Sequence, residues 1–460
     1  MLTTYDKYVA DHRVFEAGLN GVQPDWLREL RQRGLAAFET VKFPTASRGN
    51  ERWKYTNVRP IASGTFAYPF EVNGAAASDA VKQVAPWDER WDRLVFVDGH
   101  FSDGQSRVHP SSDGVRVERL GEAAAADNES AREHLGRYAG VDDDGFTAVN
   151  TAFLHDGAFV HVPDETEHES AIHLVFVSTG RTEPTATYPR TLILVGRHSR
   201  LTVVESYVGL SQRSYFTDAV AEIVVDEGGS LDHYRYLSES PEGYHIGTTR
   251  VRLGRDSRFR STSFARGAAL ARNDLQVVLD APGASCDLNG LYLTSGRQHI
   301  DNHIDIDHAM PHTSSEQYFK GILADRSRAV FSGRVLVRPG AQKTYALQAD
   351  KNLLLSEGAR VNTKPSLEIF ADDVQCFHGA TVGAVPDEAL FYMRSRGIDE
   401  ETARDLLIHG FASEIIERVA LEPLRDFLDK LFSRSVLEGH KSQRRPDAAS
   451  GRAPVPTNHG

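Results

Sequence analysis

Cysteine is scarce in this sequence: its 460 residues contain only Cys286 and Cys376. The two thiols lie 90 positions apart, so they form neither a CxxC pair nor a zinc-ribbon pattern, and so few thiols suit a reducing compartment. Long hydrophobic runs are also lacking, because the longest apolar stretches, such as residues 192–195, are far shorter than the ~20 residues of a membrane span. The first residues are acidic where a signal peptide would have an apolar run. We therefore expect a cytoplasmic protein without a membrane segment.

Several catalytic signatures are missing as well. The sequence contains no GxxxxGK[ST] phosphate loop, no GxGxxG dinucleotide fingerprint, no HExxH zinc motif and no GxSxG nucleophile elbow. ATP hydrolysis by a phosphate loop is therefore not expected. Basic charge is not in excess either, since 52 Lys and Arg face 64 Asp and Glu, for a net charge of -12. This balance argues against nonspecific binding to nucleic acids or anionic membranes.

A repeat dominates the sequence from about residue 145 onward. Short runs of Val, Ile, Leu, Phe and Tyr alternate there with tight polar turns. Serines in these turns are separated by 31, 27, 28 and 29 residues: Ser199, Ser230, Ser257, Ser285 and Ser314. A near-constant period of this length is typical of repeat architectures, and the units are strand–turn–strand without an intervening helix. The pattern predicts a mainly β protein built as a β-helix, a solenoid of stacked coils. An antiparallel sandwich is the alternative, which the regular period disfavours.

Helical patterns flank this repeat. Residues 24–38 predict an amphipathic helix that starts at Pro24 and Asp25, with Gly34 expected to end its first segment. Residues 74–145 are rich in Ala, Asp and Gly and show too little periodicity to place elements.

The sequence after Gly383 becomes helical again. Residues 389–397 end in glycine, Asp399 and Glu400 open a second segment, and Pro423 suits the first turn of a third. Apolar residues recur at helical spacing on both sides of Pro423. Those before it are expected to pack on the chain's own body, and they are Ile408, Phe411, Ile415 and Val419. Those after it are Leu424, Phe427, Leu428, Leu431 and Phe432. The predicted domains are an N-terminal helical domain (1–90), a β-helix core (91–386), a C-terminal helical domain (387–433) and a disordered tail (434–460).

The densest polar cluster is QHIDNHIDIDHAMPH, residues 298–312. Alternate residues of a strand share a face, so Ile304 and Ile306 would lie on one side and five polar residues on the other: His299, Asp301, His303, Asp305 and Asp307. Imidazoles and carboxylates together can bind a transition metal. The interpretation that we favour is an outer solenoid face in water, with the isoleucines directed inward.

A second candidate site is Cys376-Phe377-His378, in ADDVQCFHGATVG. On a strand, Cys376 and His378 would point the same way. Thiolate is a soft ligand for iron, and imidazole is a borderline one. Two ligands cannot complete an iron–sulfur cluster, so a partner chain would have to supply the others. A Cys-x-His pair taken alone is more often structural than ligating.

Three stretches together resemble one family. They are PDWLRELRQRG…FPT…ERWKYTNV near the N-terminus, LARNDLQVVLDAPGASCDLNGLYLTSGRQHIDNHIDIDHAMPHTSSEQYFKGIL (270–323), and AQKTYALQADKNLLLS (341–356) continuing through PSLEIFADDVQCFHGATVG (365–383) to ALFYMRSRGIDEETARDLLIHGF (389–411). These stretches resemble the SufB/SufD family of iron–sulfur cluster assembly scaffold proteins, and the match spans most of the chain.

The resemblance implies a right-handed parallel β-helix with α-helical domains at both ends. It also implies a complex of one SufB-type subunit, one D-type subunit and two copies of a SufC-type ATPase, in which the B- and D-type chains pair through the C-terminal ends of their β-helices. The HGAT segment of the family carries cluster-site residues, so His378 and Cys376 are candidate ligands of a transient cluster shared with the partner. The chain itself is then a scaffold, not an enzyme.

The resemblance also places the ATPase on the C-terminal helical domain. There we expect the contact to involve the loops and polar face that contain these residues: Arg394, Arg396, Gly397, Asp399, Glu400 and Glu401. Whether a reduced flavin or a cysteine desulfurase with its sulfur-transfer system acts through the complex stays open. No cofactor is expected in the isolated chain.

Within the family the chain looks D-type. Its WLRELRQRG…FPT…ERWKYT string and its HGATVG segment are D-like, and residues 355–370 lack the cysteine that B-type chains carry there. The chain departs from the family pattern at Tyr345, where aspartate is usual, and at Asp350, where asparagine is common. The rival hypothesis is a β-helix carbohydrate lyase or hydrolase that uses the acidic face of residues 299–307. That class would need an exposed groove with aromatic sugar platforms, which this strand does not supply.

Overall fold

The computed structural model describes residues 4–19, 23–46, 50–70, 78–110 and 112–443. The chain divides into two compact units, Met1–Ala384 and Val385–Gly460. The first unit contains the strands and the N-terminal helices, and the second contains the C-terminal helices.

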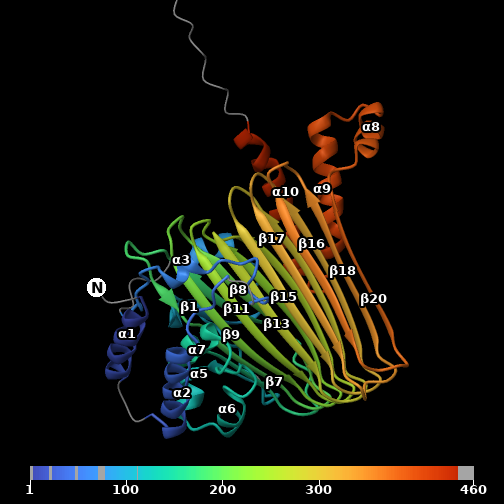
Figure 1. The fold of residues 1–460 in the computed structure, drawn as a ribbon. Coiled ribbons are helices and arrows are strands. Elements are labelled where there is room, and N and C mark those ends of the chain that lie inside the picture. Colours follow the sequence, from blue (N-terminus) through green and yellow to red (C-terminus); the bar gives the residue numbers. More distant parts are fainter. Residues whose placement is uncertain (1–3, 20–22, 47–49, 71–77, 111, 444–460) are drawn as a thin grey trace, which may run out of the picture. The chain divides into compact units, whose positions relative to one another are not determined.

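The first unit is a solenoid of β-strands that alternate between two ten-stranded sheets (Figure 1). The order of the first sheet is β2-β1-β5-β8-β10-β12-β14-β16-β18-β20, and the order of the second is β3-β4-β7-β9-β11-β13-β15-β17-β19, with β6 beside β9. The strands are β1 (Asp92–Val97), β2 (His100–Phe101), β3 (Arg116–Arg119), β4 (Gly157–Val162), β5 (Ile172–Ser178), β6 (Ala186–Thr187), β7 (Arg190–Val195), β8 (Arg200–Gly209), β9 (Phe216–Val225), β10 (Ser230–Glu239), β11 (Tyr244–Leu253), β12 (Arg258–Gly267), β13 (Leu270–Leu279), β14 (Ser285–Thr294), β15 (His299–His308), β16 (Ser314–Leu323), β17 (Arg328–Val337), β18 (Tyr345–Leu354), β19 (Arg360–Ile369) and β20 (Gln375–Gly383).

The serine repeat lies in the turns that lead into the first sheet. Ser230, for example, is the first residue of β10. Backbone hydrogen bonds stack successive turns: the N–H of Ser230 donates to the carbonyl of Ser199 (2.8 Å), and the N–H of Ser285 donates to the carbonyl of Ser257 (2.9 Å). Neighbouring strands of the repeat are parallel and in register. The predicted β-helix is therefore confirmed, and the antiparallel sandwich is wrong.

The core of the solenoid is built from alternate residues of each strand. On β15 the inward residues include Ile300, Ile304 and Ile306, each at most 2% exposed. The same alternation puts Val, Leu, Ile and Phe side chains from β1 to β17 into one apolar cluster. Each such side chain contributes roughly 1.5–3 kcal/mol when it is fully buried, so this cluster is the main stabilising element of the fold.

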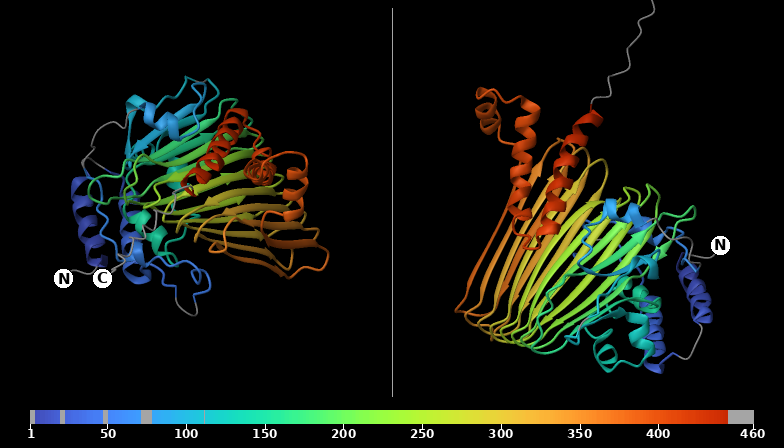
Figure 2. Two further views of the ribbon diagram at one scale, coloured as in Figure 1. Left: turned by 90° about the horizontal axis from the view of Figure 1, so that it is seen from above. Right: turned by 180° about the vertical axis from the view of Figure 1, so that it is seen from behind.

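Helices gather at the end of the solenoid where the first strands lie (Figures 1 and 2). They are α1 (Thr4–Gly18), α2 (Asp25–Val41), α3 (Arg59–Ala62), α4 (Ser78–Val84), α5 (Leu120–Ala125), α6 (Glu129–His134) and α7 (Gly145–Ala152), with a 3-10 turn η1 (Asp103–Gln105). The prediction that Gly34 ends the first helical segment is wrong, because α2 continues through it. A Cβ on Gly34 would lie 2.7 Å from the Ala152 nitrogen of α7, so the glycine allows the two helices to pack closely.

The stretch without periodicity, residues 74–145, contains short elements that a pattern search cannot detect. Helices α5 and α6 are six residues each, and they separate β3 from β4. Local capping helps to define these helices: Asn128 Oδ1 accepts from the Ala131 N–H at the start of α6, and Asp144 Oδ1 accepts from the Phe146 N–H at the start of α7. The helices and the solenoid belong to one compact unit, although the sequence suggested a boundary at residue 90.

The second unit contains α8 (Asp387–Ser395), α9 (Glu400–Ile416) and α10 (Glu422–Gln443) in its described residues. Gly397, with φ of +88°, follows α8, and Asp399 caps α9 by accepting from the Thr402 N–H at 3.0 Å. These ends lie where the sequence predicted them. Helix α10 continues through residues 434–443, past the boundary of the helical domain predicted at residue 433. Residues 444–460 of the predicted tail lie outside the described residues.

Across the described ranges, no helix has both the length and the apolar character that crossing a membrane would require.

Candidate functional site

The last strand of the solenoid, β20, is an edge strand. It pairs in parallel with β18, and no strand among the described residues pairs with its other side. Strand β19 ends the second sheet in the same way. Every residue of β20 except Cys376 is exposed. Such an edge offers unpaired backbone N–H and C=O groups to another strand, so this end of the solenoid is suited to pairing with a second chain.

Cys376 and His378 face the interior of the solenoid at this open end. They are in register with Ala346 and Gln348 of β18, which are both 1% exposed. Cys376 packs against a small apolar cluster of the last coil: Val335, Val337, Ala341, Ala346 and Ala371. His378 is exposed. Register neighbours in a sheet point to the same face, so the predicted common side of Cys376 and His378 is the interior side.

The interior next to His378 is polar. The Gln348 amide donates to Gln317 Oε1 at 3.1 Å, and both side chains are 1% exposed. Gln348 extends toward the opposite sheet, where a Cβ on Gly333 would clash with its Nε2. Gln348 Oε1 and Gln317 Nε2 have no hydrogen-bond partner within the described chain. Unpaired buried amide atoms cost stability, and departures of this kind are typical of functional regions.

A buried carboxyl group lies in the same part of the interior. Tyr292 Oη donates to Asn352 Oδ1 at 2.6 Å, and Asn352 Nδ2 donates to Asp350 Oδ2 at 2.7 Å. Burial raises the pKa of Asp350 to about 6, although the hydrogen bond from Asn352 opposes the shift. Asp350 is one of the two positions noted in the sequence as departures from the family pattern. Its carboxyl group titrates close to neutral pH.

The two cysteines occupy different environments. Cys286 on β14 is 1% exposed inside the main apolar core, and burial raises the pKa of its thiol. It therefore stays protonated and acts as a small apolar side chain, as the sequence predicted. Burial also raises the pKa of the Cys376 thiol, but this residue lies at the open end and is only partly buried. Only Cys376 is placed to meet a group from outside the chain.

Cys376 and His378 are two side chains that can bind iron, whereas an iron–sulfur cluster takes about four ligands. In the part of the chain that the structure describes, no group of three or more His, Cys, Asp or Glu side chains is placed to hold a metal ion.

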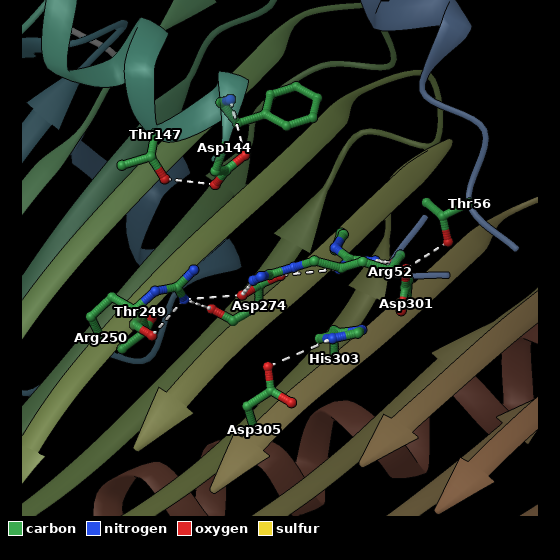
Figure 3. Close-up of polar contacts among 12 residues, drawn as sticks. Arg52, Thr56, Asp144, Thr147, Thr249, Arg250, Asp274, Asp301, His303 and Asp305 are labelled. Atoms are coloured by element: carbon green, nitrogen blue, oxygen red, sulfur yellow. Dashed lines mark hydrogen bonds and ion pairs between the residues drawn. The ribbon is translucent and has the colours of Figure 1, made fainter. Parts of the chain in front are cut away.

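The other predicted polar site is the outer face of β15 (Figure 3). Its polar residues lie opposite the buried isoleucines, as the alternation predicted. The face is not simply in water, however, because a segment from before the solenoid contacts it. Thr56 Oγ1 donates to Asp301 Oδ2 at 2.6 Å, and Thr56 also lies 3.1 Å from His299 Nε2. Asp301 is consequently only 1% exposed, which corrects the expectation of a solvated face.

Arginines neutralise the carboxylates under this segment (Figure 3). Asp274 on β13 contacts Arg52 at 2.7 Å, Arg250 at 3.0 Å and Arg272 at 3.0 Å. Burial alone would raise the pKa of Asp274, but the three guanidinium groups hold it well below its usual value. Arg272 also binds Asp301 at 2.5 Å. Carboxylates that are committed to arginine are poor metal ligands, so neither a metal site nor a sugar-binding groove is supported here.

The residues predicted to dock an ATPase lie at the end of α8, in the turn that follows it and at the start of α9. Arg394 Nη1 is 3.0 Å from Glu400 Oε2, and the Arg396 guanidinium lies 5.0 Å from the ring centre of Tyr392. Asp399 is used as the helix cap, and Gly397 provides the turn. The structure therefore gives these residues local structural roles and leaves their docking role a prediction. Of the apolar stripe, Ile408, Ile415 and Val419 are at most 2% exposed.

Sequence reasoning missed the exposed apolar residues of both regions. In the C-terminal unit they are Phe391 (75%), Tyr392 (60%) and Leu406 (51%). At the open end of the solenoid they are Ile369 (40%), Phe370 (61%), Phe377 (55%) and Val382 (48%). Strand alternation could have placed Phe377 on the outer face, but its exposure depends on β20 being the last strand of its sheet. Clusters of exposed apolar side chains mark interaction surfaces.

Comparison with known proteins agrees with this architecture. Residues 176–411 match the family described as "SUF system FeS cluster assembly, SufBD core domain", and residues 3–174 match the "SufBD protein N-terminal region". The chain belongs to the SufBD family. This assignment places it in the SUF system of iron–sulfur cluster assembly, with a β-solenoid fold as the family resemblance implied.

Individual relatives cover nearly the whole chain. An iron–sulfur cluster assembly SufBD family protein of Synechocystis sp. is 33% identical over 91% of this chain and 93% of its own length. The iron–sulfur cluster assembly proteins SufD of Escherichia coli and Bacillus subtilis are 29% and 26% identical, each over 90% of this chain and over 93% and 95% of their own lengths. The relatives named SufD agree with the D-type features read from the sequence.

Proposed function

We propose that this SufBD-family chain is the D-type scaffold subunit of a cytoplasmic SUF complex. In this proposal the open end of the solenoid pairs with a SufB-type subunit, and a nascent iron–sulfur cluster is held at the junction. The observation that carries the proposal is the geometry of β20, an edge strand whose outer side pairs with no strand of the described residues and which directs Cys376 and His378 into the open end of the interior. A partner strand would complete the edge and bring the remaining ligands.

His378 is the preferred ligand. An assembly site must release its cluster, and imidazole holds iron less firmly than thiolate does and adds no negative charge when neutral. His378 is exposed, so it reaches a partner's ligands without rearrangement. Cys376 is partly covered by the apolar cluster of the last coil, and burial keeps its thiol protonated, so its contribution needs a conformational change or a metal that displaces the proton.

The C-terminal unit is the proposed docking site of a SufC-type ATPase. The chain has no phosphate loop of its own, so ATP hydrolysis in the complex falls to a partner. Phe391, Tyr392 and Leu406 present apolar surface on α8 and α9 beside the charged residues Arg394 to Glu401. A surface with apolar anchors and a polar rim is typical of protein–protein interfaces. Reduced flavin and a cysteine desulfurase would act through this complex.

The ligand assignment is tested by substituting His378→Ala, Cys376→Ala and Cys286→Ala in the assembled complex. Clusters are then reconstituted without oxygen, and iron and sulfide are measured per complex. We expect His378→Ala to lower cluster formation by about tenfold, Cys376→Ala to lower it less, and Cys286→Ala to leave it unchanged. Cys286→Ala is the matched control, because that cysteine is buried in the core.

Each complex is first checked for subunit stoichiometry, so that loss of assembly is not taken for loss of a ligand. A His378→Ala complex that assembles normally and forms clusters at the unmodified rate would show that this subunit is purely architectural.

A further inference from the structure

The solenoid has two series of turns between its sheets. One series follows the strands of the first sheet and includes residues 295–298, 324–327 and 355–359. These turns are stacked: the Gly296 N–H donates to Asp325 Oδ2 at 2.8 Å, and the Asp325 N–H donates to Ser356 Oγ at 2.9 Å. Four arginines project from this stack and from the strands that leave it, and we name them together the arginine corner: Arg297, Arg326, Arg328 and Arg360.

The arginine corner differs from the rest of the solenoid in charge pairing. Its four side chains have no ion pair or side-chain hydrogen bond to any described residue. The stretch from β7 to β20 is described throughout, and of its other arginines only Arg255 lacks such a partner. The arginines that have one are Arg190, Arg197, Arg200, Arg213, Arg235, Arg250, Arg252, Arg258, Arg260, Arg266, Arg272, Arg334 and Arg338. On a chain with a net charge of -12, a local excess of unpaired guanidinium groups is unusual.

Two pockets adjoin these arginines. One has a volume of about 280 Å³ and is lined by Arg328, Arg360 and Asn362 together with the apolar Leu354, Val361 and Val382. The other, of about 600 Å³, lies over the stacked turns and is lined by Arg297, Arg326 and Ser356 and by the carboxylate of Asp325, whose Oδ2 accepts from the Gly296 N–H. Arg328 and Arg360 are register partners on neighbouring strands, so their guanidinium groups can act on the same ligand. The corner thus combines positive charge, hydrogen-bond donors and an apolar surface.

Positive charge beside an apolar surface favours a ligand that has both an anionic and an apolar part. Planar guanidinium groups bind phosphate and carboxylate oxygens in a bidentate manner. The apolar Leu354, Val361 and Val382 would cover a hydrophobic part of the same molecule, because they line the same pocket as Arg328 and Arg360, and its volume of about 280 Å³ is close to that of a small-molecule site. We propose that the arginine corner binds a phosphate-bearing organic molecule, with its phosphates on the arginines and its apolar part on Leu354, Val361 and Val382.

The proposed site is separate from the Cys376–His378 pair. Val382 lies four residues after His378 on β20, which corresponds to roughly 13 Å of extended strand. The proposal does not depend on the cluster ligands, and it is tested on the chain without partners, because Val382 lies on the edge strand β20 that a partner is proposed to cover. An acidic segment of another protein could also meet the arginines, but it would have no need of the concave apolar surface beside them, so we favour the small organic ligand.

Binding to the full-length chain is measured by calorimetry with two probes, pyrophosphate and ADP. Both carry two phosphates, and only ADP carries an organic part. We expect both to bind, with ADP tighter, and the double variant Arg328→Gln/Arg360→Gln to weaken both by about tenfold or more. These substitutions remove no ion pair or side-chain hydrogen bond, so folding should not be affected. Arg255→Gln is the matched control, since Arg255 is also unpaired but lies in the opposite series of turns, and it should change nothing.

A further variant, Val382→Asn, separates the two parts of the ligand. It should reduce the advantage of ADP over pyrophosphate and leave pyrophosphate binding unchanged. The proposal is overturned if neither probe binds, or if the double arginine variant binds both as well as the unmodified chain. It also fails if ADP binds no tighter than pyrophosphate, because the corner would then be a simple anion site or a contact for acidic side chains.

Discussion

At the first end of the solenoid, β1 and β4 each pair on their outer side with a short antiparallel strand, β2 and β3, and helices cover the coil. At the last end, β19 and β20 have no such strand in the described residues, and the edge residues of β20 are exposed. The interior at this last end is polar as well: β18 contributes Gln348, Asp350 and Asn352, each at most 3% exposed, and Gln348 Oε1 has no hydrogen-bond partner among the described residues.

This difference indicates that the two ends of the solenoid have different roles, stability at the capped end and association at the open end. Terminal coils of a solenoid need a cap, because an open edge promotes association with other strands. A chain that caps one end and, in its described residues, leaves the last strands of the other end unpaired on their outer side, with unpaired polar groups inside, is suited to association at that open end. The comparison predicts that equivalent substitutions at the two ends will have different effects, on stability at the capped end and on assembly at the open end.

The largest contrast is expected between two phenylalanines on the outer faces of strands at the two ends of the solenoid. Phe159 on β4 is fully buried under the helices, and Phe377 on β20 is 55% exposed. Phe159→Ala should lower the free energy of unfolding by about 3–5 kcal/mol, because it leaves a cavity. Phe377→Ala should change it by less than about 0.5 kcal/mol but weaken binding to the partner scaffold. Chemical denaturation and partner titration measure the two quantities.

The result for Phe377 decides whether the open end is an interface. A Phe377→Ala chain that is strongly destabilised would mean that the last coil is part of the structural core. A chain that keeps full partner affinity would mean that the partner binds elsewhere.

A second prediction concerns the polar interior at the open end. Burial raises the pKa of Asp350 to about 6, above the value near 3.8 expected in the unfolded chain. The folded state therefore holds this proton more tightly, and ionisation of Asp350 costs stability. The cost is absent below pH 4, grows as the pH rises toward 6 and is complete above that, where it approaches about 3 kcal/mol. Asp350→Asn should therefore stabilise the chain by up to about 3 kcal/mol at pH 7.5 and by clearly less at pH 5.

Urea denaturation at both pH values tests this prediction. Asn352→Ala is a useful companion variant, because it removes the hydrogen bond to Asp350 and should destabilise the chain more at pH 7.5 than at pH 5. An Asp350→Asn chain with the same gain at both pH values would contradict the assigned ionisation, since its effect would then come from packing.

Much of this architecture could be read from the sequence, because the repeat is a property of local pattern. Turn serines at near-constant spacing indicated the solenoid, and alternation on β15 correctly separated Ile304 and Ile306 from the polar residues. The caps of α9 and the turn after α8 followed from Asp399 and Gly397. Each of these features depends on a few neighbouring residues.

The features that the sequence did not reveal depend on residues far apart in the chain. Asp301 is buried because Thr56, 245 positions earlier, donates a hydrogen bond to it. Gly34 was expected to end a helix, but the structure places it against α7, a contact that no local pattern contains. The exposure of Phe377 and the unpaired arginines of the corner depend on which strand is last and on which acids lie within reach. The fold class could thus be predicted from patterns of neighbouring residues, whereas the geometry of the site depends on contacts between residues far apart in the chain.

The smallest effect is expected for a surface ion pair at the open end. Arg334 on β17 donates to both carboxylate oxygens of Glu368 on β19, at 2.9 and 2.7 Å, but each side chain is 41% exposed. Solvent screens such a pair, so a double-mutant cycle with Arg334→Met and Glu368→Gln should give a coupling of only about 0.2–1 kcal/mol, falling further at high salt. If a partner subunit covers β19, water is excluded from the pair, and the coupling measured on the assembled complex should exceed that of the free chain. A free-chain coupling above about 2 kcal/mol would show that this end is already desolvated without a partner, whereas an unchanged coupling in the complex would mean that the partner leaves β19 in water and pairs with β20 alone.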